Sequence, residues 1–255
     1  MVFNNFKLCG LFFLMWNYNQ FLSSQINVRD SIVRAFIFNP SVTVQVPAGD
    51  LRFRTGLFYG VGGSIFYKTS RNFYWEGESY FFTGNRIQEK DVLNRIATKD
   101  GYIIAQDGGF ADISLLFRGW NALISFGGMF LRLGPNRNCG FYLKAGTGMF
   151  QHKIRIEVRH NNVPMLDKEY KKGFDRLRGG LALQQELGYI FFSNNKRITF
   201  RTGLLCMQAF SRSLRGIVYD TGTSDSKNYT DLTIAIKISW MIPVYIRPSE
   251  YYYTR

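Results

Sequence analysis

The sequence predicts an all-β fold, an antiparallel up-and-down transmembrane β-barrel of eight strands, with ten strands as the alternative. The main observation is the segment 232–246, where large apolar residues alternate without a break from Leu232 to Ile246. Successive strand side chains point to opposite faces, so one face of this segment is apolar throughout. A strand in a soluble protein has about 5–6 residues, whereas a tilted transmembrane strand needs about 9–11. The length of the segment therefore favours a membrane barrel.

The composition agrees with this fold. Aromatic residues make up 17% of the chain, and 25 glycines stand against 6 prolines, which suits long strands joined by tight turns. The mean hydropathy of -0.12 excludes a bundle of membrane helices. It is compatible with a barrel, because only alternate residues of each strand face lipid.

The N-terminal residues predict a signal for export. Lys7 supplies a positive charge, residues 8–16 form a short apolar core, and residues 21–25 resemble a cleavage region. The core is too short for a transmembrane helix, which needs roughly 20 residues, and a buried helix is the alternative. We expect a signal peptide at 1–24, a lead-in at 25–35, an outer-membrane barrel at 36–246 and a C-terminal tail at 247–255.

Nine segments have the period-2 pattern of strands. They are 36–46, 52–68, 73–82, 111–118, 121–133, 141–158, 181–191, 198–210 and 232–246. Bacterial single-chain barrels have an even number of strands, so either 36–46 lies outside the wall or a tenth strand lies at 102–106. In 141–158 the apolar parity changes, which predicts a β-bulge near Gln151.

The connections between these segments differ in length. Those at 85–109, 159–178 and 214–230 are long, whereas 134–138 and 193–196 are short turns. Barrels of the outer membrane have short periplasmic turns and long external loops. Counted back from a periplasmic C-terminus, the loop 85–109 falls on the side of the short turns, which breaks the rule.

The face opposite the apolar one carries charges of both signs, and we expect them to pair inside the barrel. These residues are Arg52, Arg54, Glu76, Glu78, Asp112, Lys144, Glu186, Arg201 and Lys237. Lys237 is expected to pair with Glu186 or Asp112. The interior of an eight-stranded barrel is only wide enough to be filled by side chains, so a porin-like pore is not expected.

The net charge of +14 points to an anionic partner. An exported chain meets little nucleic acid, so we expect the phosphates of lipopolysaccharide or an envelope protein; solubility and lumen pairing are the alternative explanation. The basic residues of the loop 159–178 are the predicted binding site, with a solvated loop without a ligand as the alternative. They are Arg159, Lys168, Lys171, Lys172, Arg176 and Arg178.

Enzymatic chemistry has little support in the sequence. The two histidines, His152 and His160, show no spacing typical of a metal site, so no metal, cofactor or catalytic residue is predicted. A lipid hydrolase or acyltransferase site on His152, Ser211 and Asp220 is an alternative, as is a soluble lipocalin-like binder. Cys139 and Cys206 are expected to be free thiols.

Several segments resemble a group of Bacteroidota cell-envelope barrels that includes the PorT-like barrels linked to type IX secretion. They are 152–156, 162–164, 170–177 and 240–245, together with the turn Pro47-Ala48-Gly49-Asp50-Leu51, and the similarity covers about residues 40–253. The resemblance implies an outer-membrane location and a non-enzymatic structural or interaction role, with a function accessory to protein secretion as the finer expectation. Unlike proteobacterial barrels, the chain continues beyond its last strand as a tail.

Overall fold

The structure is a computed structural model that describes residues 35–69, 71–89, 92–159, 163–167, 170–193, 199–219 and 222–245. The predicted signal peptide 1–24 and tail 247–255 lie outside the described residues, as does the lead-in 25–35 except for its last residue. Among the described residues, no helix has the length and hydropathy that a membrane-crossing helix needs.

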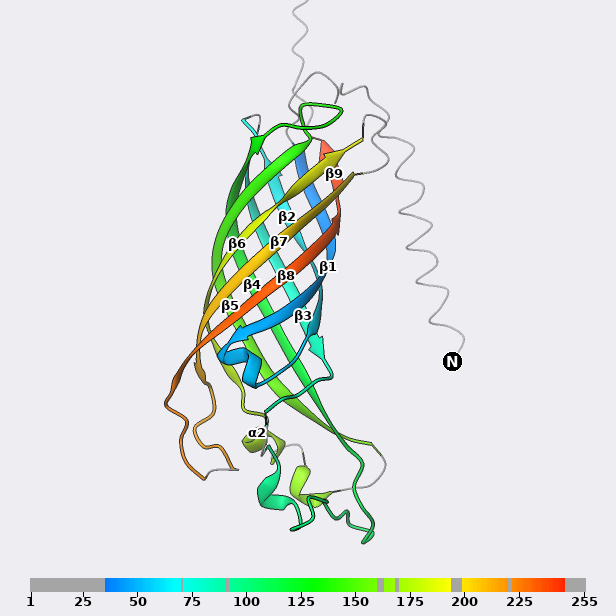
Figure 1. Ribbon diagram of the computed structural model, residues 1–255, viewed down its shortest axis with the longest axis vertical. Helices are drawn as coiled ribbons and strands as arrows, with labels where there is room; N and C mark the ends of the chain where they lie inside the picture. The colour runs from blue at the N-terminus through cyan, green and yellow to red at the C-terminus, as the bar shows by residue number, and fades with distance from the viewer. Residues whose placement is uncertain are drawn as a thin grey trace, which may run out of the picture.

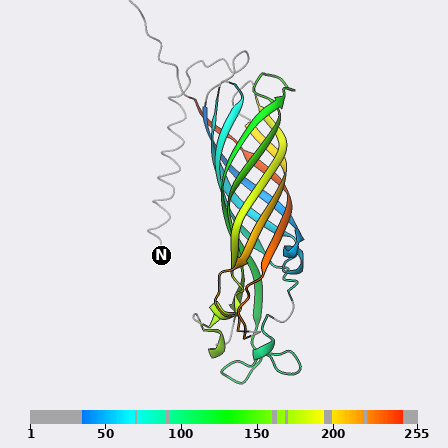
Figure 2. The ribbon, with the colours of Figure 1, turned by 90° about the vertical axis from the view of Figure 1, so that its left-hand side faces the viewer.

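Antiparallel strands form a closed barrel (Figures 1 and 2). The elements in chain order are β1 (Ala35–Gly49), η1 (Asp50–Phe53), β2 (Phe58–Lys68), β3 (Phe73–Gly84), η2 (Asn94–Ile96), β4 (Ile113–Leu131), β5 (Gly140–Val158), η3 (Pro164–Leu166), α2 (Lys171–Phe174), β6 (Arg178–Phe192), β7 (Thr199–Ser213), β8 (Asn228–Trp240) and β9 (Ile242–Tyr245). From β1 to β8 each strand pairs with its neighbour in sequence, and β1 also pairs with β8, which closes the ring.

The short β9 continues β8 along β1. Ser239 of β8 pairs with Ser41 of β1, and Ile242 of β9 pairs with Phe38 in the same register. Between the two strands, the amide of Met241 donates to the carbonyl of Thr199 at 3.0 Å. The wall therefore has eight strands, as predicted, and the alternation of the last segment continues across Met241.

The alternative of ten strands was wrong, and the nine predicted segments form eight wall strands for a specific reason. The segments 111–118 and 121–133 belong to one strand, β4, which pairs with β5 without interruption from Ile113 to Met129. The segment 36–46 is a wall strand. The segment 102–106 is outside the wall, since it contributes only an isolated bridge from Ile104 to Phe110.

Because the segments 111–118 and 121–133 form one strand, the loop 85–109 lies at the opposite end of the barrel from the predicted one. The connections after β1, β3, β5 and β7 all lie at one end of the barrel, the lower end in Figure 1, which we call the loop end. The turns after β2, β4 and β6 lie at the other end, with the start of β1 and β9. The three long connections are thus on one side, and the predicted position of 85–109 on the short-turn side was wrong.

The predicted bulge near Gln151 is also absent from the described pairing. From Gly140 to Ile156 the even-numbered residues of β5 point inward, and the β4–β5 register shifts only between Met129 and Leu131. The apolar parity changes because β4 and β5 run beyond the ring as a two-stranded ribbon, with Ile113 opposite Val158. There the outer face meets water, and the inner apolar face packs against loop residues such as Phe174.

Apolar side chains cover the outside of the barrel on every strand. Examples that are each 41% exposed or more are Val44, Val61, Trp75, Ile124, Leu143, Leu187, Leu204, Ile236 and Val244. A continuous exposed belt of this kind is incompatible with water and is what lipid requires of a spanning barrel. The structure is a transmembrane β-barrel, and the lipocalin-like alternative, which needs a polar exterior, was wrong.

Candidate functional site in the lumen and at the loop end

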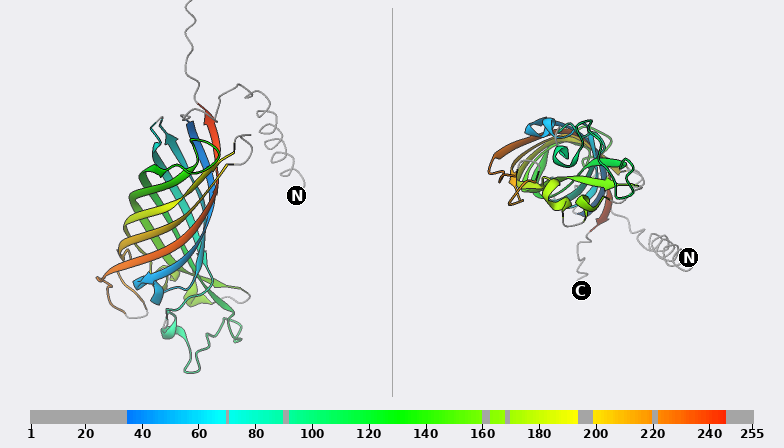
Figure 3. Two further views of the ribbon diagram at one scale, coloured as in Figure 1. Left: turned by 45° about the horizontal axis from the view of Figure 1, so that its top comes forward. Right: turned by 90° about the horizontal axis from the view of Figure 1, so that it is seen from below.

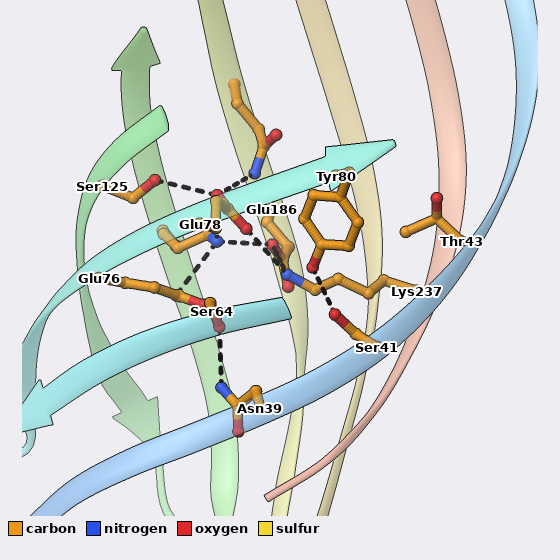
Figure 4. A network of polar contacts seen from close by, with 12 residues as sticks. Asn39, Ser41, Thr43, Ser64, Glu76, Glu78, Tyr80, Ser125, Glu186 and Lys237 are labelled. Carbon is orange, nitrogen blue, oxygen red and sulfur yellow. Dashed lines mark hydrogen bonds and ion pairs between the residues drawn. The ribbon is translucent and has the colours of Figure 1, made fainter. Parts of the chain in front are cut away.

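The centre of the lumen holds six charged side chains, which we call the lumen ion network. Three carboxylates and three cations balance one another, and every side chain is at most 1% exposed. The members are Glu76 and Glu78 on β3, Lys144 on β5, Glu186 on β6, Arg201 on β7 and Lys237 on β8. Figure 4 shows how several of these side chains converge from different strands.

Lys144 lies at the centre of this network. Its Nζ atom is 3.1 Å from Oε2 of Glu76, 2.8 Å from Oε1 of Glu78 and 2.9 Å from Oε2 of Glu186. Arg201 donates hydrogen bonds from both terminal nitrogens of its guanidinium. Nη1 lies 2.9 Å from Oε2 of Glu76, and Nη2 lies 3.1 Å from Oε1 of Glu186. Lys237 binds Glu186, as the sequence predicted. Shared partners of opposite charge offset the cost of burying each ion.

Aromatic and apolar side chains close the lumen on both sides of the network. Towards the loop end, Phe58, Phe82 and Phe117 are among the buried residues of one cluster, and their rings lie 4.8–5.7 Å apart. Towards the short turns, Tyr74 and Tyr142 belong to a second buried cluster. The network lies between these two clusters, and the strands form a complete ring around the lumen (Figure 3).

Tyr142 shows how tightly this interior is packed. Its hydroxyl donates to Oε1 of Glu186, and the Arg201 guanidinium lies 4.3 Å from its ring centroid. A Cβ atom at Gly188 or Gly203 would lie 2.7 or 2.6 Å from that hydroxyl. The absence of a side chain at these two glycines therefore leaves room for the Tyr142 side chain, which fills this part of the lumen.

Two of the predicted lumen charges lie elsewhere. Arg52 is exposed in η1, and Asp112 is exposed in the loop before β4, so neither joins the network. The pairing of Lys237 with Asp112 was therefore wrong. Arg54 is buried at the barrel mouth, where its Nε atom is 3.4 Å from Glu89. Burial lowers the pKa of the Arg54 guanidinium to about 10.

The residues proposed for the catalytic alternative that the structure describes, His152 and Ser211, are not arranged as that alternative requires. Asp220 lies outside the described residues, and Asp231 is the carboxylate that contacts both His152 and Ser211. His152 Nε2 is 3.0 Å from Oδ2 of Asp231, and the Ser211 hydroxyl donates to the same oxygen. The imidazole therefore faces the carboxylate rather than the hydroxyl it would have to activate, and all three side chains are buried. This geometry is that of a structural cluster.

The predicted binding residues of the loop 159–178 separate into two groups. Arg159, Lys171 and Lys172 line a groove on the outer wall, whereas Lys168 lies outside the described residues. Arg176 and Arg178 turn to the barrel mouth. Arg176 pairs with Glu89 at 2.5 Å, and the Arg178 guanidinium stacks 3.5 Å from the Tyr229 ring centroid. The structure therefore does not bring the six residues together.

The long loops are packed against one another and against the β4–β5 ribbon. Asp175 accepts from Nε of Arg215 at 2.9 Å and also binds its Nη2 atom, which joins the loop after β5 to the loop after β7. These hydrogen bonds raise the pKa of the Arg215 guanidinium above its usual value. Leu166 and Phe174 are buried in the apolar cluster of this cap. The described residues of these loops therefore pack into a common cap.

The groove on the outer wall includes cations that sequence reasoning did not single out. It measures about 1200 Å³ and lies along the loop ends of β3, β4 and β5. The additional basic residues that line it are Arg118, Lys153, Arg155 and Arg215. Arg118, Lys153 and Arg155 sit on the outward parity of their strands, the parity that is apolar over most of the wall.

In the described part of the chain, no group of three or more histidine, cysteine, aspartate or glutamate side chains is arranged to hold a metal ion. Cys139 and Cys206 are free thiols, as predicted.

The closed ring of strands and the apolar outer wall define the class: an eight-stranded transmembrane β-barrel. No model of a protein family matches the sequence, and no curated protein matches it. Among solved structures, Neisserial surface protein A aligns at 11% identity and a TM-score of 0.41, over 80% of this chain and 96% of that one. Ail of Yersinia pestis (12% identity, TM-score 0.39) covers 82% of this chain and 99% of its own. OprG, an outer membrane protein of Pseudomonas aeruginosa, aligns at 10% identity and a TM-score of 0.39, over 85% of this chain and 99% of that one.

Proposed function

We propose that this protein is a non-enzymatic barrel of an outer membrane that conducts no solute and acts as a structural or interaction component of the cell envelope. The observation that carries the proposal is the lumen ion network, closed on both sides by apolar layers. A barrel of eight strands has room for side chains but not for a channel. Its useful surfaces are then the outer wall and the cap at the loop end.

A role without catalysis is supported by the site that the sequence offered for catalysis. His152 and Ser211 both contact one oxygen of Asp231, and all three side chains are buried, away from a substrate in solution. The packed cap at the loop end offers a surface for a protein partner instead. The resemblance to PorT-like barrels supports the finer proposal of a function accessory to protein secretion.

Conductance in a planar lipid bilayer tests the sealed lumen. The full chain, refolded and inserted into the bilayer, is expected to give no discrete current steps, while a porin inserted in the same way gives them. Stable open-channel steps from the purified protein would contradict the proposal. Fractionation of the envelope adds a separate check of location, because the protein should remain with the outer membrane; recovery in the soluble periplasmic fraction would also contradict it.

The secretion role needs a different measurement. Deletion of the gene is expected to reduce the amount of protein exported to the medium, and the intact gene supplied in trans should restore it. A variant of the cap, Arg159→Ala with Lys171→Ala and Lys172→Ala, keeps the barrel and tests whether the loop end is the surface involved. Unchanged secretion in the deletion strain would remove this finer proposal and leave the envelope role in place.

A further inference from the structure

The outer-wall groove contains two cations that face each other directly. Arg118 on β4 pairs in register with Lys153 on β5, and both follow the outward parity of their strands. Side chains opposite each other in an antiparallel pair have Cβ atoms about 4.5–5.5 Å apart, and like charges at this distance are destabilising. Among the described residues, Arg118 has no hydrogen-bonding or ion-pair partner. An anion seated between the two side chains would remove the repulsion.

The acidic residues of the groove do not neutralise it. Seven basic residues line it against two acidic ones, Glu157 and Asp175. Glu157 is paired with Arg155 at 2.8 Å. Asp175 is held by Arg215, so that Lys153 approaches it only to 4.0 Å. The groove therefore keeps an excess of positive charge at its centre.

The depth of these cations relative to the apolar belt is defined by the next row of residues. In that row Trp120 pairs with Gln151, and the indole Nε1 donates to the Gln151 side chain at 2.9 Å. Tryptophan is typical of the boundary between hydrocarbon and headgroups. In the row beyond, Ala122 pairs with Met149 on the lipid side. The cations thus stand one row outside the hydrocarbon, at the depth of lipid phosphates.

A shallow furrow begins in the row after Trp120 and Gln151, and its lining reaches across the outer wall from β1 to β5. It measures about 690 Å³, and its floor is made of small residues, among them Gly77, Ser79 and Ala122. Ile65 and Met149 stand at its sides. A Cβ atom added at Gly77 would meet nothing within 4 Å, so the floor is open to lipid. Such a hollow has the apolar lining that an acyl chain requires.

We propose that this wall binds one phosphorylated glycolipid of the outer leaflet, with a phosphate between Arg118 and Lys153, reinforced by Arg155, and an acyl chain in the furrow. The proposal rests on the outer-membrane placement proposed above, with the loop end outside. Charge-assisted hydrogen bonds from arginine suit phosphate oxygens. An apolar hollow in the row next to the cations favours a lipid over a free anion.

Native mass spectrometry of the full chain in a neutral detergent measures this binding, with bisphosphorylated lipid A as the probe. The triple variant Arg118→Gln, Lys153→Gln, Arg155→Gln should weaken binding by at least about tenfold. A hydrogen bond from a charged group contributes more binding free energy than a hydrogen bond between neutral groups. Arg212→Gln, on the outward parity of β7, is the matched control and should bind like the wild type. Heat-modifiable migration on a gel confirms that each variant is folded.

A second variant tests the furrow independently. Gly77→Leu fills the floor without a clash, and it should weaken lipid A binding several-fold while dephosphorylated lipid A still binds less well than the phosphorylated form. Ala145→Leu, also outward on β5 but outside the furrow, is its control. Equal binding of dephosphorylated lipid A, unchanged binding by the triple variant, or full competition by millimolar inorganic phosphate would each overturn the proposal. None of these results depends on conductance, so a failure here is distinct from a failure of the sealed-barrel function.

Discussion

Replacing Lys144 by methionine tests the energetics of the lumen ion network most sharply. The side chain keeps a similar volume, but three carboxylates that lie 2.8–3.1 Å from its Nζ atom lose their shared cation. Arg201 and Lys237 then face Glu76, Glu78 and Glu186 with one negative charge uncompensated. Removal of one partner from a buried ionic cluster costs about 3–5 kcal/mol. We expect the free energy of unfolding to fall by about that amount.

Urea unfolding of the refolded protein in lipid vesicles, followed by tryptophan fluorescence, measures the change. The midpoint should fall with the slope unchanged, as for a loss of stability alone. Lys99→Met, at an exposed position of the loop after β3, is the matched control and should stay within about 0.5 kcal/mol of wild type.

A double variant separates the charge imbalance from the loss of packing. Glu78→Gln combined with Lys144→Met leaves two carboxylates and two cations. The pair should therefore cost less than the sum of the single variants, with a coupling of about 0.5–3 kcal/mol. A loss below about 1 kcal/mol for Lys144→Met, or strictly additive costs, would refute the reasoning that the network is held by mutual neutralisation.

Three further changes test packing, surface charge and the cap. Gly203→Val should collide with Tyr142, whose hydroxyl lies 2.6 Å from the new Cβ, and lower the unfolding free energy by about 1–3 kcal/mol; an unchanged urea midpoint would contradict this. Lys153→Gln should relieve like-charge repulsion and raise stability by about 0.2–1 kcal/mol in zwitterionic detergent, where a decrease would argue against it. Asp175→Asn should break the bond between two long loops, so that limited proteolysis cuts the cap faster while the barrel core stays intact; equal cleavage rates would count against an ordered cap.

The alternation of apolar and polar residues was enough to predict the barrel and most of its lumen charges. The residue next to a lipid-facing one along a strand points inward, so the prediction that Glu76, Lys144 and Lys237 face the lumen is confirmed. Arg52 was assigned wrongly because the period-2 pattern was extended into η1, where the backbone turns. Pattern alone does not show where a strand begins.

The errors over β4 and β5 have one physical cause. Where the two strands leave the membrane, water replaces lipid on the outer face, and the loop core places apolar residues such as Ile154 and Ile156 on the inner face. The polarity of the faces therefore inverts while the backbone stays regular. The sequence signal of this inversion is the same as that of a bulge or a strand break, and the pairing partners decide between them.

The outer-wall groove depends on register, which no single segment contains. Arg118 and Lys153 are 35 positions apart and become neighbours only through the β4–β5 pairing. The loop residues Lys171 and Lys172 were predicted as binding residues and do line the groove, but its centre is on strands. Cations on the outward parity just beyond an aromatic residue are the signal by which such a site can be found.

Spin labelling along the last strand tests the central claim, a barrel whose outward apolar face contacts lipid, most directly. Single cysteines at Ile234, Ile236 and Ile238, which are 55–58% exposed, carry the label in a background in which the other cysteines are serine. In lipid vesicles, all three labels should be relaxed by oxygen far more than by a water-soluble nickel chelate, and a label at Lys99 should show the reverse. Ready access of the nickel chelate to Ile236 would contradict the account.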